Sequence, residues 1–413
     1  MRKKLSNLIL PLAAVAGFLA LVLPRLLDAG PDPVEFAKAI LLAGAWIIAT
    51  FFAWSLCRFR VREILEGVRR FAKKGRRTTA LLFGAIASLT LIVLIEAVFL
   101  VINKSRVNST ATTTSVKPKD CAPDDYLGYR LIPNSTATAK KTRTHDGQVL
   151  YSVRYTTDTE GRRTNKASPA TSDKTVAFFG GSFIFGEGVN DEATLPHLFA
   201  EAAPGHKALN YGCHGYGSAQ VLGLIEKDGA KIAKEARAKS ALIGVYGFID
   251  DHIGRTVGSM RHVNWFCAKH PYYEVNGDSI EHRGNFLTSR PTRSVIYWLL
   301  GKSQTLKFLD FNWPLSDSRS AIETTARVIA KARDVFESKT GSDKFVVFLY
   351  PGVIHGTALI EHLDTFGVKY LDYSKLIDIK APGMAIENDG HPTPKANKIL
   401  AQRLAEDLAV YLR

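Results

Sequence analysis

Long apolar stretches crowd the first quarter of this 413-residue chain, and shorter blocks of apolar and polar residues follow them. The long stretches occupy residues 8–27, 34–57 and 79–102. Each has about 20 residues or more, which is enough for a helix to cross a hydrocarbon core of roughly 30 Å. The first is longer than the apolar part of a signal peptide and lacks a clear cleavage site. The pattern therefore predicts a membrane region, residues 1–103, with three transmembrane helices.

The positive charge of the chain predicts its orientation in that membrane. The net charge is +15, and residues 58–77 carry nine Lys or Arg against two Glu. A short basic loop between spans belongs on the cytoplasmic side, so three spans place everything after Asn103 outside the cytoplasm. We therefore expect a multi-pass protein of the bacterial cytoplasmic membrane, with its C-terminal domain on the periplasmic or extracellular side. Since topology explains most of the charge, and no module typical of nucleic-acid binding is visible, nucleic acid is not an expected partner.

The rest of the chain divides into a tether and a folded domain. Residues 104–124 are rich in Ser, Thr, Asn and Lys and predict a tether. Residues 125–413 form the folded domain, which begins with short antiparallel strands up to about residue 160. Within it, the stretch 253–318 breaks the later pattern and predicts an insertion that caps the sheet. Its tryptophans fit either a packed cap core, which we prefer, or a surface on which sugars stack.

From residue 174 onward, segments with strand character alternate with segments of helical periodicity. Such alternation predicts an α/β fold, in which a parallel sheet is covered by helices on both faces. Five strands are expected, at residues 176–179, 208–210, 241–246, 345–350 and 368–373.

A glycine-rich turn follows the first of these strands and presents Ser182 after Gly180 and Gly181. In an open α/β sheet, chemistry is usually located at this carboxyl edge of the strands. Asp389 and His391 come just before the last predicted helix. A serine becomes a nucleophile when a histidine, oriented by an acid, takes its proton. The predicted catalytic residues are therefore Ser182 as nucleophile, His391 as base and Asp389 as orienting acid.

An attacked carbonyl also needs hydrogen-bond donors for its developing negative charge. The backbone N–H groups of Ser182 and of Gly215, in the loop after the second strand, are the expected donors. A third donor is expected from the segment after the third strand, which contains Asp251 and His252. It would come from His252, from the backbone, or from a protonated Asp251.

The glycine pattern around Ser182 differs from the elbow of α/β-hydrolases, because Ile184 stands where that motif needs glycine. The chain instead resembles the SGNH, or GDSL-type, hydrolase superfamily from about Lys174 to its C-terminus. This resemblance implies a flavodoxin-like five-stranded parallel sheet, no metal, no cofactor, and ester hydrolysis or acyl transfer by the serine. Four blocks carry it, at Phe179–Gly188, Asn210–Gly215, Tyr246–His252 and Asp389–Pro392.

Three positions depart from the pattern of that superfamily. Gly181 stands where the family has Asp, and the acidic Asp250-Asp251 stands where the family supplies an Asn that stabilises the oxyanion. The family's acid usually lies three residues before the histidine, a position that Asn388 occupies. Either Asp389, two residues before, or a carbonyl oxygen therefore orients His391.

The expected function is a membrane-anchored serine esterase that forms an acyl-enzyme. The resemblance implies acyl esters, acetyl above all, of cell-envelope polysaccharide or lipid as substrates. Two alternatives are an O-acyltransferase to a sugar hydroxyl and an inactive SGNH-like domain that binds polysaccharide. Outside the cytoplasm disulfides are allowed, and Cys121, Cys213 and Cys267 permit at most one, whose pairing the sequence leaves open.

Overall fold

The chain divides into two compact units, Met1–Lys104 and Ser105–Arg413. The computed structural model describes residues 77–413, apart from 171, 237–240, 278 and 412–413. The first two predicted membrane spans, residues 8–27 and 34–57, lie outside the described residues, so they stay predictions.

The third predicted span, residues 79–102, falls within the long helix α5 (Arg77–Thr110). Over the described part of the chain, no helix combines the length and the apolar character that crossing a membrane requires.

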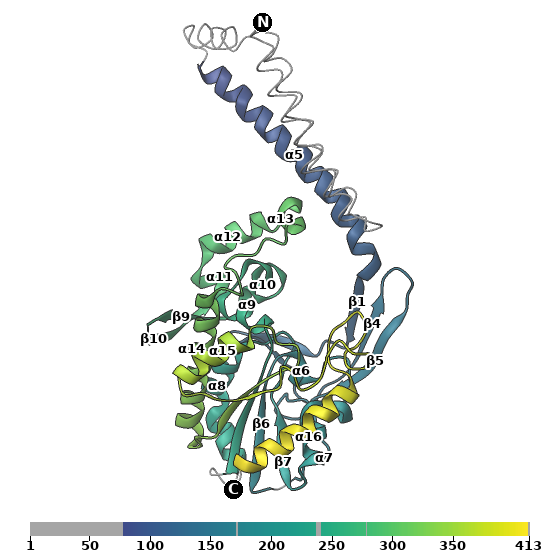
Figure 1. Cartoon of the computed structure of the whole chain (residues 1–413), viewed down its shortest axis with the longest axis vertical. Helices are drawn as coiled ribbons and strands as arrows, with labels where there is room; N and C mark the ends of the chain where they lie inside the picture. Colours follow the sequence, from purple (N-terminus) through teal and green to yellow (C-terminus); the bar gives the residue numbers. More distant parts are fainter. Residues whose placement is uncertain (1–76, 171, 237–240, 278, 412–413) are drawn as a thin grey trace, which may run out of the picture. The chain divides into compact units, whose positions relative to one another are not determined.

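A five-stranded parallel sheet lies at the centre of the second unit (Figure 1). Its strand order is β12-β11-β8-β6-β7, and every neighbouring pair is parallel. Numbered along the chain, this is the order 2-1-3-4-5 of flavodoxin-like doubly wound sheets. The prediction of an α/β fold with a five-stranded parallel sheet is confirmed. The strands are β6 (Lys174–Gly180), β7 (His206–Asn210), β8 (Leu242–Phe248), β11 (Phe345–Leu349) and β12 (Lys369–Asp372).

Helices cover both faces of this sheet (Figure 1). Successive side chains of a strand point to opposite faces. Val176 and Phe178 of β6 accordingly pack with α7 and α16, whereas Ala177 and Phe179 pack with α8 and α14. Because both faces are buried, the strands are almost continuously apolar. The covering helices are α7 (Leu195–Ala202), α8 (Ser218–Glu235), α14 (Arg319–Thr340), α15 (Gly356–Thr365) and α16 (Pro394–Tyr411).

Residues 104–124, predicted as a tether, are largely ordered secondary structure. After the end of α5, β1 forms the edge of a three-stranded antiparallel sheet of order β1-β4-β5, and β2 pairs with β3. The threonines that suggested a linker are also β-branched, and they suit a strand once a partner strand is available. The strands are β1 (Thr112–Lys117), β2 (Cys121–Asp124), β3 (Gly128–Leu131), β4 (Thr136–Arg143) and β5 (Val149–Thr156).

The predicted cap insertion forms a small layer of helices with one hairpin. Its own core consists of Met260, Val263, Phe286 and Tyr297. The elements are α9 (Asp251–Val257), α10 (Met260–Trp265), β9 (Pro271–Asn276), β10 (Ser279–Asn285), α11 (Phe286–Ser289), α12 (Pro291–Leu300) and α13 (Gln304–Phe308). Two short 3-10 helices, η2 (Asp191–Ala193) before α7 and η4 (Cys267–Lys269) in the cap, complete the unit.

The preferred interpretation of the cap tryptophans, a packed core, is wrong. Trp265, Trp298 and Trp313 are 70%, 57% and 48% exposed. Helix α12 buries Ser294 and Tyr297 against the cap core, and this turns the neighbouring Trp298 outward.

Candidate active site

Ser182 lies where β6 ends and the single helical turn α6 (Ser182–Phe185) begins. Gly181 precedes it in an extended conformation. A Cβ atom at Gly181 would lie 2.8 Å from the carbonyl oxygen of Tyr216 and 3.1 Å from Nε2 of His252. Any side chain at this position would therefore displace the turn, which explains why glycine stands where the resembled superfamily has aspartate.

The buried guanidinium of Arg163 stabilises the turn through hydrogen bonds. Its Nε donates to Asp191 at 2.6 Å, and its Nη1 donates to the carbonyl oxygens of Phe185 and Gly186 at the end of α6. Its Nη2 donates to two further backbone oxygens. Because the Arg163 guanidinium hydrogen-bonds several segments at once, it fixes the position of Ser182 relative to β5 and η2.

Ser182, His391 and Asp389 form one hydrogen-bonded chain. Nε2 of His391 lies 2.8 Å from Oγ of Ser182, and Nδ1 of the same ring is hydrogen-bonded to Oδ1 of Asp389. Ser182 is nearly buried, at 5% exposure. With Nδ1 protonated toward the carboxylate, Nε2 is free to accept the serine proton, which is the arrangement of serine hydrolases.

A tight loop before α16 explains why an acid two residues from the histidine can reach its ring. The backbone N–H of Ile386 donates to the carbonyl oxygen of His391 at 2.8 Å, so the chain folds back on itself. Oδ1 of Asp389 also accepts the backbone N–H of His391 at 3.1 Å. Asn388, at the spacing usual for the resembled superfamily, is exposed and contacts Glu387. Of the two alternatives, the structure places the Asp389 carboxylate, not a carbonyl, against the ring.

Lys141 of β4, which the sequence analysis did not single out, holds the other oxygen of Asp389. Its Nζ lies 2.5 Å from Oδ2, and the Asp389 side chain is fully buried. Burial alone would raise the pKa of Asp389, but its bonds to His391 and Lys141 outweigh this and hold it well below the usual value. The carboxylate therefore stays charged and oriented. A lysine in a polar strand carries no local signal of this role.

A second histidine, His214, is partly buried between two carboxylates beside the catalytic candidates. Nδ1 of His214 lies 2.7 Å from Oε2 of Glu187, and its Nε2 lies 3.0 Å from Oδ2 of Asp120. Burial would lower the pKa of His214, but these two bonds raise it to about 10. In turn, His214 outweighs the burial of Glu187 and lowers the pKa of that group to about 2. Glu187 also approaches Nε2 of His391, at 3.9 Å.

Gly215 lies on a loop that continues the pairing between β7 and β6. The N–H of Cys213 donates to the carbonyl oxygen of Gly180 at 3.2 Å. Gly215 has a φ of +68°, and a Cβ there would lie 2.4 Å from the ring of Phe266. Gly215 and Ser182 line the same cavity, as an oxyanion site built from backbone donors requires.

The acidic segment after β8 serves mainly to hold structure. Asp250 accepts the backbone N–H groups of Ile354 and His355 at 2.7 and 3.1 Å. Asp251 lines the cavity, and its carboxylate pairs with Arg255, one turn later on α9, at 3.2 Å. A carboxylate in this pair accepts hydrogen bonds and does not donate them.

His252 lies beneath the serine turn and does not line the cavity. Its Nδ1 is hydrogen-bonded to the Tyr246 hydroxyl at 2.7 Å. Its Nε2 is buried, has no hydrogen-bond partner among the described residues, and lies close to Gly181. Burial first, and then nearby Arg255 and His262, lowers the pKa of His252 well below the usual value, so this ring is neutral.

Arg255 is a cation beside the serine turn, and sequence reasoning missed it. Its Nη1 donates to the carbonyl oxygen of Tyr216 at 2.9 Å and would lie 3.3 Å from a Cβ at Gly181. The side chain is nearly buried yet lines the cavity. Its spacing of four residues from Asp251 on a helix was the available signal. Arg255 offsets the negative charge of this segment beside the place where an oxyanion would form.

The candidate active site opens into a cavity of about 800 Å³. Small-molecule sites usually measure roughly 300–1,000 Å³. Ser182 and His391 line one part of it, residues 351–353 line another, and the cap contributes Trp265 and Phe266. The cap insertion therefore completes the site.

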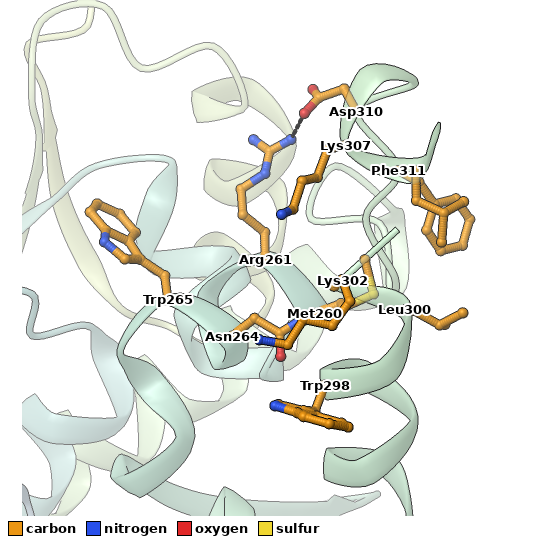
Figure 2. A pocket seen from close by; sticks show the side chains of 12 residues that line it. Met260, Arg261, Asn264, Trp265, Trp298, Leu300, Lys302, Lys307, Asp310 and Phe311 are labelled. Atoms are coloured by element: carbon orange, nitrogen blue, oxygen red, sulfur yellow. Dashed lines mark hydrogen bonds and ion pairs between the residues drawn. The ribbon is translucent and has the colours of Figure 1, made fainter. Parts of the chain in front are cut away.

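A second cavity, of about 480 Å³, lies within the cap between α10, α12 and α13. Figure 2 shows Arg261 paired with Asp310 above it and Trp298 projecting from α12. Trp265 lines both cavities, so they adjoin at this side chain.

Over the described residues, no group of three or more His, Cys, Asp or Glu side chains is arranged to hold a metal ion. Cys121, Cys213 and Cys267 form no disulfide within the part of the chain that the structure describes. The thiols of Cys213 and Cys121 interact, and burial, followed by this contact, raises the pKa of Cys213 well above its usual value. A thiol in this state is a poor nucleophile.

No family model and no curated protein matches the chain. Among solved structures, it is similar to an acetyl xylan esterase (Est2A) from the rumen bacterium Butyrivibrio proteoclasticus. The identity is 14% over 62% of this chain and 67% of that chain, and the TM-score is 0.34. A likeness this distant carries no argument about function, which rests on the site geometry.

Proposed function

We propose that this protein is a serine esterase of the SGNH type, which cleaves acyl esters through an acyl-enzyme. The observation that carries the proposal is the hydrogen-bonded chain from Ser182 through His391 to Asp389. Its position at the carboxyl edge of a 2-1-3-4-5 sheet, with the motif blocks around it, supports the same conclusion.

In the first half of the reaction, Oγ of Ser182 attacks the carbonyl carbon of the ester while its proton moves to Nε2 of His391. Nε2 then gives this proton to the leaving alcohol oxygen, the ester bond breaks, and an acyl-serine remains. In the second half, water attacks the acyl carbon and gives a proton to Nε2, which returns it to Oγ as the acid leaves. Asp389 holds Nδ1–H and stabilises the imidazolium that forms in each half.

The backbone N–H groups of Ser182 and Gly215 are the proposed donors to the oxyanion. Loss of one such donor typically costs about 3–4 kcal/mol of transition-state stabilisation. Arg255 contributes positive charge on the side where the resembled superfamily has asparagine. Neither Asp251 nor His252 is assigned as a donor, because Asp251 pairs with Arg255 and His252 does not line the cavity.

The test is covalent labelling of the full-length protein with a fluorophosphonate. We expect label on Ser182, no label on the Ser182→Ala variant, and full label on Ser152→Ala, which alters an exposed serine of β5. Peptide mapping that places the label on another residue, or a wild-type protein that takes no label, would refute the nucleophile assignment.

The proposed substrates are acetyl or other short acyl esters of cell-envelope polysaccharide or lipid. Two rival functions give different products. A transferase would move the acyl group to an added sugar at the expense of hydrolysis, whereas a binding protein would show equal turnover for wild type and Ser182→Ala. Mass spectrometry of the products with and without a sugar acceptor separates the three functions.

We also propose that the chain resides in the bacterial cytoplasmic membrane with this domain outside, on sequence grounds alone. The supporting features are the three apolar stretches, residues 8–27, 34–57 and 79–102, and the basic segment 58–77, because the third stretch must cross the membrane to place the domain opposite that segment. Protease added to intact spheroplasts should digest the domain. Protection until lysis would show that the chain crosses an even number of times and that the domain faces the cytoplasm.

A further inference from the structure

Helix α12 of the cap presents an apolar face to solvent. Its Tyr297 points into the cap core and is fully buried. The opposite side carries Val295, Ile296, Trp298 and Leu299, each between 45% and 58% exposed. A surface helix of a soluble domain normally places such residues against the core and polar residues outward.

The segment after α13 extends this face. Leu309, Phe311, Trp313 and Leu315 are each between 44% and 64% exposed. Together with the four exposed residues of α12, they are called the cap apolar face.

The two segments of the cap apolar face lie against each other. They meet at the cap cavity, which Trp298 of α12 and Phe311 of the later segment both line (Figure 2). Monomeric soluble proteins rarely expose contiguous apolar surface of this kind, and where they do it marks an interaction site.

Cations border the cap apolar face and touch its tryptophans. The Arg293 guanidinium lies 4.8 Å from the Trp313 ring, and Nζ of Lys302 lies 5.3 Å from the Trp298 ring. Lys307 lines the same cavity as Trp298. Indole rings flanked by lysine and arginine are typical of side chains at a membrane–water interface, where the apolar body meets acyl chains and the cation meets phosphate.

We propose that the cap apolar face binds the surface of a bilayer that contains anionic lipids. A sugar would use the tryptophans and the cations, but it has no use for the exposed aliphatic side chains of Val295, Ile296, Leu299, Leu309 and Leu315. Acyl chains bury all of these side chains, and anionic headgroups complement Lys302 and Lys307. This contact brings the cap, which lines the catalytic cavity, to the membrane surface, and it is independent of the proposed esterase activity.

The experiment uses the full-length protein in vesicles of equal parts phosphatidylcholine and phosphatidylglycerol. A photoreactive benzophenone amino acid replaces Leu299 or, as the control, Val410, which is exposed on α16 outside the cap. We expect lipid adducts at position 299 and few at position 410. The variants Lys302→Gln and Lys307→Gln should each reduce the adducts at 299 by about fivefold in these vesicles and not in pure phosphatidylcholine.

Thermal unfolding followed by circular dichroism verifies that each variant is folded. Equal lipid adducts at 299 and 410 would overturn the proposal. So would crosslinks from 299 to residues 1–104 or to a second copy, because the face would then be a protein contact. Adducts to added polysaccharide in preference to lipid would assign the face to a glycan instead.

Discussion

Nζ of Lys141 lies 2.5 Å from Oδ2 of Asp389, while Oδ1 of the same carboxylate is bonded to the ring of His391. A strand of the small antiparallel sheet thus supports the acid of the candidate triad. A buried charge is tolerated when it is paired and hydrogen-bonded, and here both oxygens are satisfied. The small sheet is therefore part of the site.

Replacing Lys141 with methionine should lower the free energy of unfolding at neutral pH by about 2–4 kcal/mol, because a buried carboxylate loses one partner. The folded pKa of Asp389 lies below its unfolded value of 3.8, so its stabilising effect is present above that value and is lost as pH falls through the folded pKa. Lys141→Met should therefore lose less stability on acidification than wild type. Urea unfolding at neutral pH and at about pH 3 measures this difference.

The control for that prediction is Lys140→Met, which alters the exposed neighbour of Lys141 on β4. It should match wild type at both pH values. If Lys141→Met also matches wild type, the ion pair contributes nothing to stability.

Asp389→Asn should lower kcat by about 10³–10⁴-fold, because an amide no longer holds the imidazole in the required tautomer or stabilises the imidazolium. Asn388→Gly, one residue earlier and exposed, should leave kcat within about twofold, because glycine tolerates the φ of +56° at this position. Steady-state hydrolysis of an acetyl ester gives both values. A small effect of Asp389→Asn would point to a serine–histidine dyad.

His214→Gln should destabilise the protein by about 3 kcal/mol near pH 6, since Asp120 and Glu187 lose the cation between them. The folded pKa of His214 is about 10, above the unfolded value of 6.5. Its stabilising effect is therefore complete below pH 6.5 and is lost as pH rises through about 10. Urea unfolding across this pH range should show that the free energy of unfolding falls less for His214→Gln than for wild type. His145 is exposed, so His145→Gln should show the same fall in the free energy of unfolding as wild type.

Gly181→Ala should slow labelling of Ser182 and destabilise the fold by about 1–3 kcal/mol, because the new Cβ meets the backbone oxygen of Tyr216. Gly356→Ala is the matched control: its Cβ would meet side-chain atoms of Leu349 at 3.0 Å and Val353 at 3.5 Å, and no backbone atom is among these contacts. Fluorophosphonate labelling rates and urea unfolding measure both effects. If Gly181→Ala is labelled at the wild-type rate, the turn has space for a Cβ atom at this position.

Asp250→Ala should loosen residues 351–355, since two backbone N–H groups lose their acceptor, at a cost of about 1–3 kcal/mol. Faster protease cleavage within this loop, detected by mass spectrometry, is the expected result. Asp251→Ala removes only a half-exposed ion pair with Arg255 and should cost less than about 1 kcal/mol. If Asp251→Ala costs more stability than Asp250→Ala, then Asp251, and not Asp250, stabilises this segment.

The apolar pattern of the chain was enough to predict the layered fold. Residues 176–179 and 345–349 are apolar without a break, which suits strands buried on both faces, and the intervening helices repeat apolar positions with helical periodicity. The cap was misread because both interpretations of its tryptophans use the same residues. Which side of α12 is buried depends on the packing of Tyr297 in the cap core, and tertiary contacts decide this packing.

The sequence by itself determined which groups are available for chemistry: Ser182 after a strand, and Asp389 and His391 in one short loop. Only the tertiary structure decided that they meet and what holds them. Lys141 lies 248 residues before Asp389. Asp120 and Glu187 enclose His214 from two further segments. Such contacts arise from how distant segments fold against one another, and a lone charged residue carries no local pattern that reveals its partner.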